Sequence, residues 1–252
     1  MIKTSFTQEI KALLNEDIIY NLNIYGALEN NPELEIYTDN EKYPKGVVVK
    51  EGYFSYIYSK NVEFIKKAKE EFFSKDGYYG FTGIMYDIAT ILQEGSEIDW
   101  QNRCHLYYLP KENLDRSLIK NEVKSIDIKD ANIVDEFYQY RGEDSLKIIE
   151  YDISLRPSSA VYIDGEIACW VLVHRDNSMG IMYTKEEHRK KGYAVDVSID
   201  LASKIIDRGK IPFLQIVHGN KASVALAEKC NFKYYGEVSW FGIKVENPKD
   251  EG

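Results

Sequence analysis

The chain has 252 residues, of which 44% are hydrophobic and 29% are charged, and its formal net charge is −9. This composition is ordinary for one large or two small globular domains, and the acidic balance excludes a whole-surface attraction to nucleic acid. Three cysteines at unpaired spacings indicate neither a disulfide framework nor a zinc site. Residues 1–20 contain no signal-peptide core and no run is long enough for a membrane span, so we expect a cytoplasmic protein.

The first half of the sequence, residues 1–120, predicts a small α/β domain. Thr7 can cap a helix whose apolar residues recur at helical spacing, and turn residues separate the short apolar runs that follow. The predicted elements are a helical region over 6–29 that breaks near residue 21, strands over 34–37, 46–50 and 53–58, a helix over 61–74, a strand over 78–82, a helix over 85–93 and a strand over 104–109. The charged stretch 111–120 then indicates a linker.

The second half, residues 121–245, predicts another α/β domain, followed by a tail over 246–252. Asp164-Gly165 is a two-residue turn signal between apolar runs, and Gly209 is placed to end a long helix. The predicted elements are helices over 130–140 and 143–153, strands over 159–163, 166–173 and 180–184, a helix over 193–207, a strand over 212–217, a helix beginning near 220, and a final hairpin over 234–236 and 238–244. This order echoes the first half, although the sequence contains no strict repeat.

A basic segment with one glycine, Glu187-His-Arg-Lys-Lys-Gly-Tyr-Ala194, joins the predicted strand at 180–184 to the predicted helix at 193–207. A helix start leaves backbone N–H groups without internal partners, and the helix dipole adds positive potential there. Gly192 removes the side chain that would keep an anion from this backbone. The segment therefore predicts a diphosphate site; the alternative is an ordinary solvated basic surface.

Several motifs at compatible spacings resemble one family. Arg189-x-x-Gly192-x-Ala194 resembles the coenzyme A pyrophosphate loop of the GNAT superfamily of acyl-CoA N-acyltransferases, and Asn220…Ser223…Leu226…Phe232 resembles the helix after the fifth strand of that fold. Arg156-Pro-Ser-Ser-Ala-Val-Tyr162 and Ala168-Cys-Trp170 are similar to the glycine N-acyltransferase-like branch. The resemblance covers about residues 123–245. It implies an α/β (α+β) fold with a mixed, mostly antiparallel sheet flanked by helices.

The resemblance also implies a coenzyme A thioester, most simply acetyl-CoA, as co-substrate, and no metal. The implied coenzyme-binding residues are Met182, Tyr183 and Thr184 on the fourth strand, Arg189, Lys190, Lys191, Gly192, Tyr193 and Ala194 in the loop, and Asn220 and Ser223 at the next helix. The strand residues would pair with the pantetheine arm and supply the oxyanion donor. An ordinary core strand and a simple helix cap are the alternatives for Met182–Thr184 and Asn220.

The sequence lacks the general base and the general acid of the related enzymes at their usual positions. The related branch has a glutamate near the start of its fourth strand, where this chain has Asn177–Gly180, and many members have a tyrosine where this chain has Ala227. His218 is the expected base, since an unperturbed imidazole has a pKa near ~6.5, and Tyr235 is the expected acid. A turn-capping histidine, a core aromatic and a water chain are the alternatives. We expect His105 and His174 to be structural.

We therefore expect an acyl-CoA-dependent N-acyltransferase that acylates a primary amine of a small molecule or amino acid by direct attack in a ternary complex. One alternative is a non-catalytic acyl-CoA-binding or sensing protein. A tandem-domain ligase that uses a charged tRNA is disfavoured by the acidic charge and the coenzyme-like loop. The N-terminal half would be a degenerate GNAT-like half or an unrelated α/β domain, and it would wall the acceptor cleft or support a homodimer.

Overall fold

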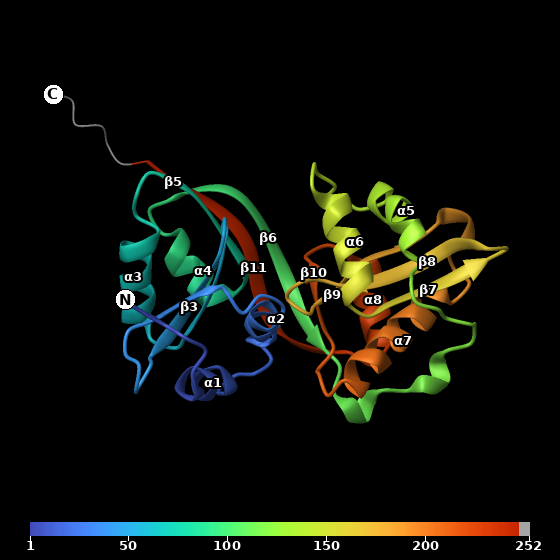
Figure 1. The fold of residues 1–252 in the computed structure, drawn as a ribbon, viewed down its shortest axis with the longest axis horizontal. Coiled ribbons are helices and arrows are strands. Elements are labelled where there is room, and N and C mark those ends of the chain that lie inside the picture. The colour runs from blue at the N-terminus through green and yellow to red at the C-terminus, as the bar shows by residue number, and fades with distance from the viewer. Residues whose placement is uncertain (247–252) are drawn as a thin grey trace. The chain divides into compact units, whose positions relative to one another are not determined.

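The structure, a computed structural model, describes residues 1–246, and these divide into two compact units (Figure 1). The first unit contains residues 1–106, 217–219 and the chain from 236 onward; the second contains residues 107–216 and 220–235. The segment 111–120, which the sequence suggests as a linker, thus belongs to the second unit. Most of the last strand, from residue 236 onward, belongs to the first unit. Among the described helices, none combines the length and hydrophobicity that a membrane span requires.

The first unit alternates short strands with helices. Its elements are β1 (Ile2–Thr4), α1 (Gln8–Asn15), α2 (Leu22–Asn30), β2 (Glu35–Thr38), β3 (Gly46–Glu51), β4 (Phe54–Ser59), α3 (Val62–Phe72), β5 (Gly77–Met85), α4 (Tyr86–Gln93) and most of β6 (Glu97–Tyr108). Side chains begin two of the helices: Thr7 accepts a hydrogen bond from the amide of Ile10, and Asn61 accepts one from Phe64. These caps explain why the predicted helix starts lie close to the observed ones.

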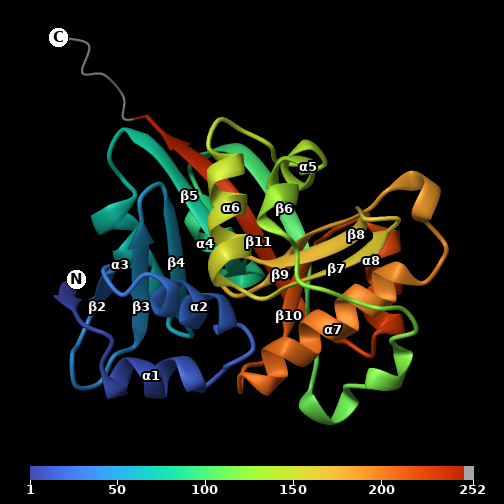
Figure 2. The same ribbon diagram turned by 45° about the vertical axis from the view of Figure 1, so that its right-hand side comes forward.

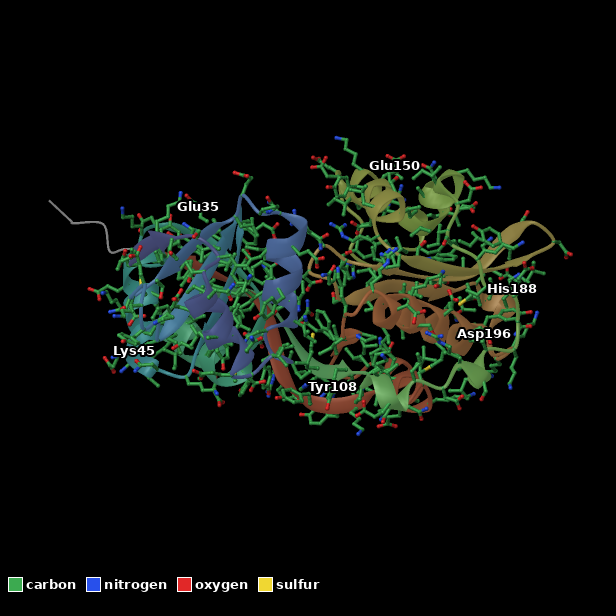
Figure 3. All side chains as sticks on the ribbon, turned by 60° about the horizontal axis from the view of Figure 1, so that its bottom comes forward. Glu35, Lys45, Tyr108, Glu150, His188 and Asp196 are labelled. Carbon is green, nitrogen blue, oxygen red and sulfur yellow. The ribbon has the colours of Figure 1, made fainter. Side chains whose placement is uncertain are left out.

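The second unit repeats this alternation. Its elements are the 3₁₀ turns η1 (Lys111–Asn113), η2 (Arg116–Leu118) and η3 (Ile128–Asp130), then α5 (Ala131–Glu136), α6 (Ser145–Leu155), β7 (Ser158–Ile163), β8 (Glu166–Val173), β9 (Met179–Thr184), η4 (Glu186–His188), α7 (Tyr193–Asp207), β10 (Phe213–Val217), α8 (Lys221–Lys229) and the start of β11 (Lys233–Val245). Asp196 on α7, which Figure 3 labels, is 1% exposed. It accepts hydrogen bonds from Lys120 N and Asn121 Nδ2, each 2.7 Å long. The segment before η3 is thereby fixed to α7.

Both halves of the chain present the same order of elements: two helices, three strands, a helix, a strand, a helix and a strand. Strands β2–β4 form one antiparallel meander, and β7–β9 form another. The larger sheet has the order β1-β2-β3-β4-β5-β11-β6-β10, and β4 and β5 are its parallel pair across the α3 crossover. The expected α/β fold with mostly antiparallel strands is confirmed.

The last strand of each half takes a place beside the other half's strands. β11, at the end of the second half, pairs with β5 in antiparallel register, and β6, at the end of the first half, neighbours β10. β6 and β11 lie side by side in Figure 1 and Figure 2. Phe241 and Ile243 of β11 are completely buried in the core of the first unit, where Phe241 stacks on Phe81 at 4.7 Å between ring centroids.

Some predicted boundaries were wrong. The expected hairpin over 234–236 and 238–244 is one continuous strand of 13 residues, because Gly236 serves a close approach and not a turn: a Cβ there would overlap with the hydroxyl of Tyr20. β6 begins at Glu97, seven residues before the predicted 104, and its first part is too polar to show an apolar run. The predicted helix at 130–140 ends at Glu136, and β1 was not predicted. The expected tail at 246–252 lies, apart from residue 246, outside the described residues.

Candidate coenzyme site

Strand β9 forms one edge of the three-stranded sheet and pairs only with β8 among the described strands. The register between them shifts between Trp170 and Leu172 of β8, so that β9 carries an extra residue there, which is a β-bulge. Ile181 lies at this point with a φ of 48°, a left-handed conformation that β-branched residues rarely adopt. No residue pattern marks this bulge, since Ile181 and its neighbour Met182 are simply apolar.

Two backbone donors lie at the free edge of β9. The amide of Lys185 donates to the carbonyl of Ala168 on β8, 2.9 Å away, and strand amides alternate in direction. By this alternation the amides of Met182 and Thr184 face the free edge, while that of Tyr183 faces β8. Two of the three expected strand residues thus present N–H groups that an extended ligand arm could reach.

Tyr183 has a different place from its two neighbours. Its ring stacks on Phe137 at 4.6 Å and lies 5.5 Å from the ring of the fully buried Trp170. Its hydroxyl accepts a hydrogen bond from Arg189 over 3.2 Å. Tyr183 therefore links the strand to the basic loop through its side chain.

The loop between β9 and α7 presents a row of unpaired amides. The amides of His188 and Arg189 donate to backbone carbonyls within the loop. None of the five amides from Lys190 to Ala194 makes a hydrogen bond with another group in the described part of the chain. Lys190 and Gly192 have φ angles of 61° and 91°, left-handed conformations of the kind found in anion-binding backbone turns, and α7 starts directly afterwards. A Cβ on Gly192 would meet nothing within 4 Å, so this side is open.

The basic side chains of the loop differ in their contacts: Arg189 is hydrogen-bonded within the protein, whereas Lys190 and Lys191 are exposed. The guanidinium of Arg189 donates to the carbonyl of Thr184, to Glu186 and to the Tyr183 hydroxyl, each at 3.2 Å, so it braces the loop against β9. Lys190 and Lys191 are exposed, and no carboxylate of the described residues lies within ion-pair distance of either. The two lysines are the cations that remain available to an anionic ligand.

Asn220 and Ser223, which were expected to contact the coenzyme, form the N-terminal cap of α8. The side-chain oxygen of Asn220 accepts a hydrogen bond from the amide of Ser223, 3.1 Å away, and so caps the helix. Ala227, at the position of the family's tyrosine, is 3% exposed and packs in the core of the second unit. This position supplies no proton donor.

Tyr235, the expected acid, lies near the start of β11 in the second unit. It is 37% exposed, and its ring meets that of Tyr108 edge-on at 5.6 Å. The neighbouring Tyr234 is also exposed. Neither tyrosine is the buried strand aromatic that the sequence left as the alternative.

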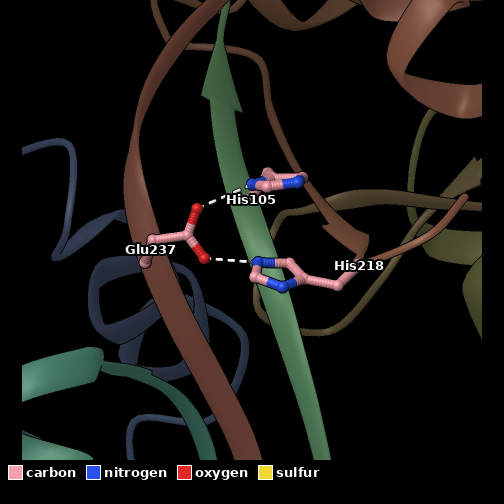
Figure 4. Close-up of side chains that lie close together, drawn as sticks. All are labelled: His105, His218 and Glu237. Atoms are coloured by element: carbon pink, nitrogen blue, oxygen red, sulfur yellow. Dashed lines mark hydrogen bonds and ion pairs between the residues drawn. The ribbon is translucent and has the colours of Figure 1, made fainter. Parts of the chain in front are cut away.

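His218, the expected base, lies in the first unit at the end of β10. Its amide donates to the carbonyl of Arg103 on β6, 2.8 Å away, and its ring stacks on His105 at 4.2 Å between centroids. Glu237 of β11 bridges the two rings: Oε1 lies 2.7 Å from His105 Nδ1, and Oε2 contacts His218 Nε2 (Figure 4). His105 was expected to be structural and Glu237 was missed, because 132 positions separate them and no local pattern joins them.

No cysteine is placed to act as a nucleophile. All three are buried. Burial raises the pKa of Cys169 and of Cys230 to about 11, and that of Cys104 to about 12. Since the thiolate is the reactive form, these residues are inert near neutral pH. This fits direct attack on a thioester better than a covalent cysteine intermediate.

The first unit has no equivalent of the basic loop. At its corresponding junction only two residues, Lys60 and Asn61, separate β4 from α3. The side chain of Asn61 accepts from the amide of Phe64, and the amide of Asn61 itself donates to the hydroxyl of Ser59. One amide of this helix start is thus capped by a side chain, and the two-residue junction has neither the glycine nor the run of basic residues found before α7.

Comparison with known proteins agrees with this architecture. Residues 163–241 match the family model described as FR47-like protein. The fold is similar to that of a Drosophila protein solved by X-ray crystallography, with 15% identity, a TM-score of 0.76, and coverage of 97% of this chain and 98% of that chain. No match was found among curated proteins.

Two further structures carry the same arrangement. A GNAT-family acetyltransferase from Colwellia psychrerythraea aligns with a TM-score of 0.57 at 11% identity, over 97% of this chain and all (100%) of that chain. A tandem GNAT protein from the clavulanic acid biosynthesis pathway aligns with a TM-score of 0.56 at 9% identity, over 98% and 99%. The fold of this chain is thus similar to that of GNAT-family structures along nearly its whole length. Within the second half, residues 163–241 are the part that is similar to the FR47-like model.

Gly180, at the start of β9, is expected to tolerate no side chain. A Cβ there would overlap with Nε2 of His174, so Gly180→Ala should lower the free energy of unfolding by about 1–3 kcal/mol, as overpacking does. The double variant Gly180→Ala/His174→Ala should recover part of this loss in urea unfolding. Gly142→Ala is the control, because its Cβ would meet nothing within 4 Å. Equal stabilities of the Gly180 and Gly142 variants would contradict the packing described here.

Proposed function

We propose that the second unit binds an acyl-CoA, most simply acetyl-CoA, and that the protein transfers the acyl group to a primary amine of a small molecule or amino acid. The observation that carries the proposal is the row of five unpaired amides at Lys190–Ala194 in front of α7. Such a row, with the helix dipole behind it, suits a diphosphate. The adjacent open edge of β9 suits the amide-containing pantetheine arm.

Within this site, each group has a separate task. The amides of the loop and the ammonium groups of Lys190 and Lys191 would bind the pyrophosphate, while Arg189 would hold the loop in shape. An edge amide of Met182 or Thr184 would donate to the thioester oxygen as it becomes negative. Asn220 and Ser223 would contact the arm at the start of α8, in addition to forming the cap.

The reaction needs no covalent enzyme intermediate. The amine nitrogen attacks the thioester carbonyl, the new C–N bond forms, and the C–S bond breaks with its electrons on sulfur. The amine proton then ends on the thiolate or in solvent, and a free thiol with a pKa near ~8.5 is a tolerable leaving group near neutrality. The inert cysteines described above agree with this direct route.

A second candidate function is acyl-CoA sensing without turnover. The observation that favours it is the buried Ala227 at the position where many GNAT enzymes have a tyrosine. Calorimetry with acetyl-CoA and a thiol-release assay with a panel of primary amines separate the two. Binding together with amine-dependent thiol release supports transfer, binding without release across the panel supports sensing, and absence of binding contradicts both.

A further inference from the structure

A carboxylate and two imidazoles meet in the first unit. His105 lies on β6, His218 directly follows β10, and Glu237 lies on β11, so three adjacent strands each contribute one ligand-type side chain. One potential ligand atom from each residue lies within 4.8 Å of the other two. It is the one such group of histidine, cysteine and acidic side chains that residues 1–246 contain. We propose that His105, His218 and Glu237 form a site for a divalent transition-metal ion, with zinc as the probe.

The donor set suits such an ion. Two imidazole nitrogens and one carboxylate are a known ligand combination for zinc, and they leave a further position for water or another ligand. Zinc holds these atoms at about 2.0–2.2 Å, which separates them from one another by roughly 3.4 Å in a tetrahedron. The 2.7 Å between His105 Nδ1 and Glu237 Oε1 would therefore open by less than about 1 Å when an ion enters.

The solvent exposure of the three side chains and the rigidity of the backbone around them also suit a metal site. The side chains of His105, Glu237 and His218 are 31%, 27% and 37% exposed, so an ion could reach them from solvent. The backbone around them is nevertheless fixed. The amide of His218 is bonded to β6, and the Tyr20 hydroxyl packs against Gly236, the residue before Glu237. Ligands on three paired strands are already held close together, which lowers the entropy lost on binding.

The consequence of the site would be structural. An ion bound there would join β10, β6 and β11, and so would tie the C-terminal strand to the first unit. Binding would raise the melting temperature with metal concentration, because only the folded chain brings the ligands together. A bound ion would also take up the imidazole nitrogen of His218. His218 could therefore not be a metal ligand and a general base at the same time. The absence of a metal expected from the sequence is revised by this proposal.

The test is zinc titration of the full chain after treatment with a chelator. We expect one zinc ion per chain by calorimetry and visible d–d absorption when cobalt(II) is substituted. His105→Ala, His218→Ala and Glu237→Gln should each weaken binding by about a hundredfold or more, since loss of merely a supporting contact costs 10–100-fold. His188→Ala is the matched control, because this histidine lies outside the cluster. The zinc affinity of this variant should equal that of the unaltered chain.

Three results would overturn the proposal: no binding to the folded chain, several weak sites of equal affinity, or equal affinity in His188→Ala and the cluster variants. Circular dichroism of each variant shows whether a loss of binding reflects unfolding. Coenzyme affinity, measured on the same preparations, is independent of this outcome, because the proposed coenzyme residues lie in the second unit. Failure of the metal site therefore leaves the proposed function open, and the reverse also holds.

Discussion

Gly192→Val is expected to weaken the binding of coenzyme A by about a hundredfold. The glycine lies in the middle of the unpaired amides, with a φ of 91°, and a Cβ there would project into open space on the side where a phosphate would lie. The valine side chain would exclude that phosphate, and one or two hydrogen bonds to a charged group, worth about 1.5–3 kcal/mol each, would be lost. Calorimetry with coenzyme A on the purified variant measures the effect.

Backbone strain needs its own control in this experiment, because valine at a left-handed position also destabilises the fold. Gly209→Val provides it: Gly209 has a φ of 74°, lies beyond the other end of α7, and would likewise meet nothing within 4 Å. Both variants should lose similar stability, while Gly209→Val keeps its coenzyme affinity. An affinity for coenzyme A that is unaltered in Gly192→Val would remove the main support for the proposed function.

Phe241→Ala is expected to lower the free energy of unfolding by about 3–5 kcal/mol, the usual cost of truncating a buried phenylalanine. Phe241 is completely buried, and its ring stacks on Phe81 with 17° between the planes. The truncation would leave a cavity in the core of the first unit, although the residue lies near the end of the sequence. Urea unfolding followed by circular dichroism gives the free energy.

The matched control for this prediction is Tyr78→Ala on β5, the strand that pairs with β11. Tyr78 is 57% exposed, so its truncation should change the free energy of unfolding by about 0.5 kcal/mol or less. Similar losses for Phe241→Ala and Tyr78→Ala would mean that β11 does not fill the core as described.

The local structure around the candidate coenzyme site could be predicted from the sequence, because it depends on neighbouring residues. The range of α7 was predicted without error, and Gly209 ends it with a left-handed φ as expected. The loop and its glycine follow from the same local chemistry. The bulge at Ile181 could not be predicted, since it is defined by the register between two strands and not by residue type.

Features that depend on distant parts of the chain were missed, because contacts between residues far apart in the sequence leave no local pattern. Gly236 indicated a turn, and only the nearby Tyr20 hydroxyl explains why the backbone stays extended there. Glu237 lies 19 positions from His218 and 132 from His105, so no spacing rule joins them. The pairing of β11 with β5 brings Glu237 to its place, and sequence periodicity does not predict which strands become neighbours.

The place of β11 between β5 and β6 also affects how the protein can fold during synthesis. Residues 1–106 emerge from the ribosome early, but the strand that fills the gap in their sheet is made only after residues 107–232. Until then β5 has an unpaired edge and Phe81 has no stacking partner, which is the kind of surface that aggregates or recruits chaperones. We therefore expect ribosome-bound chains that stop before β11 to be sensitive to protease in their N-terminal half, and chains that include β11 with a spacer to be resistant.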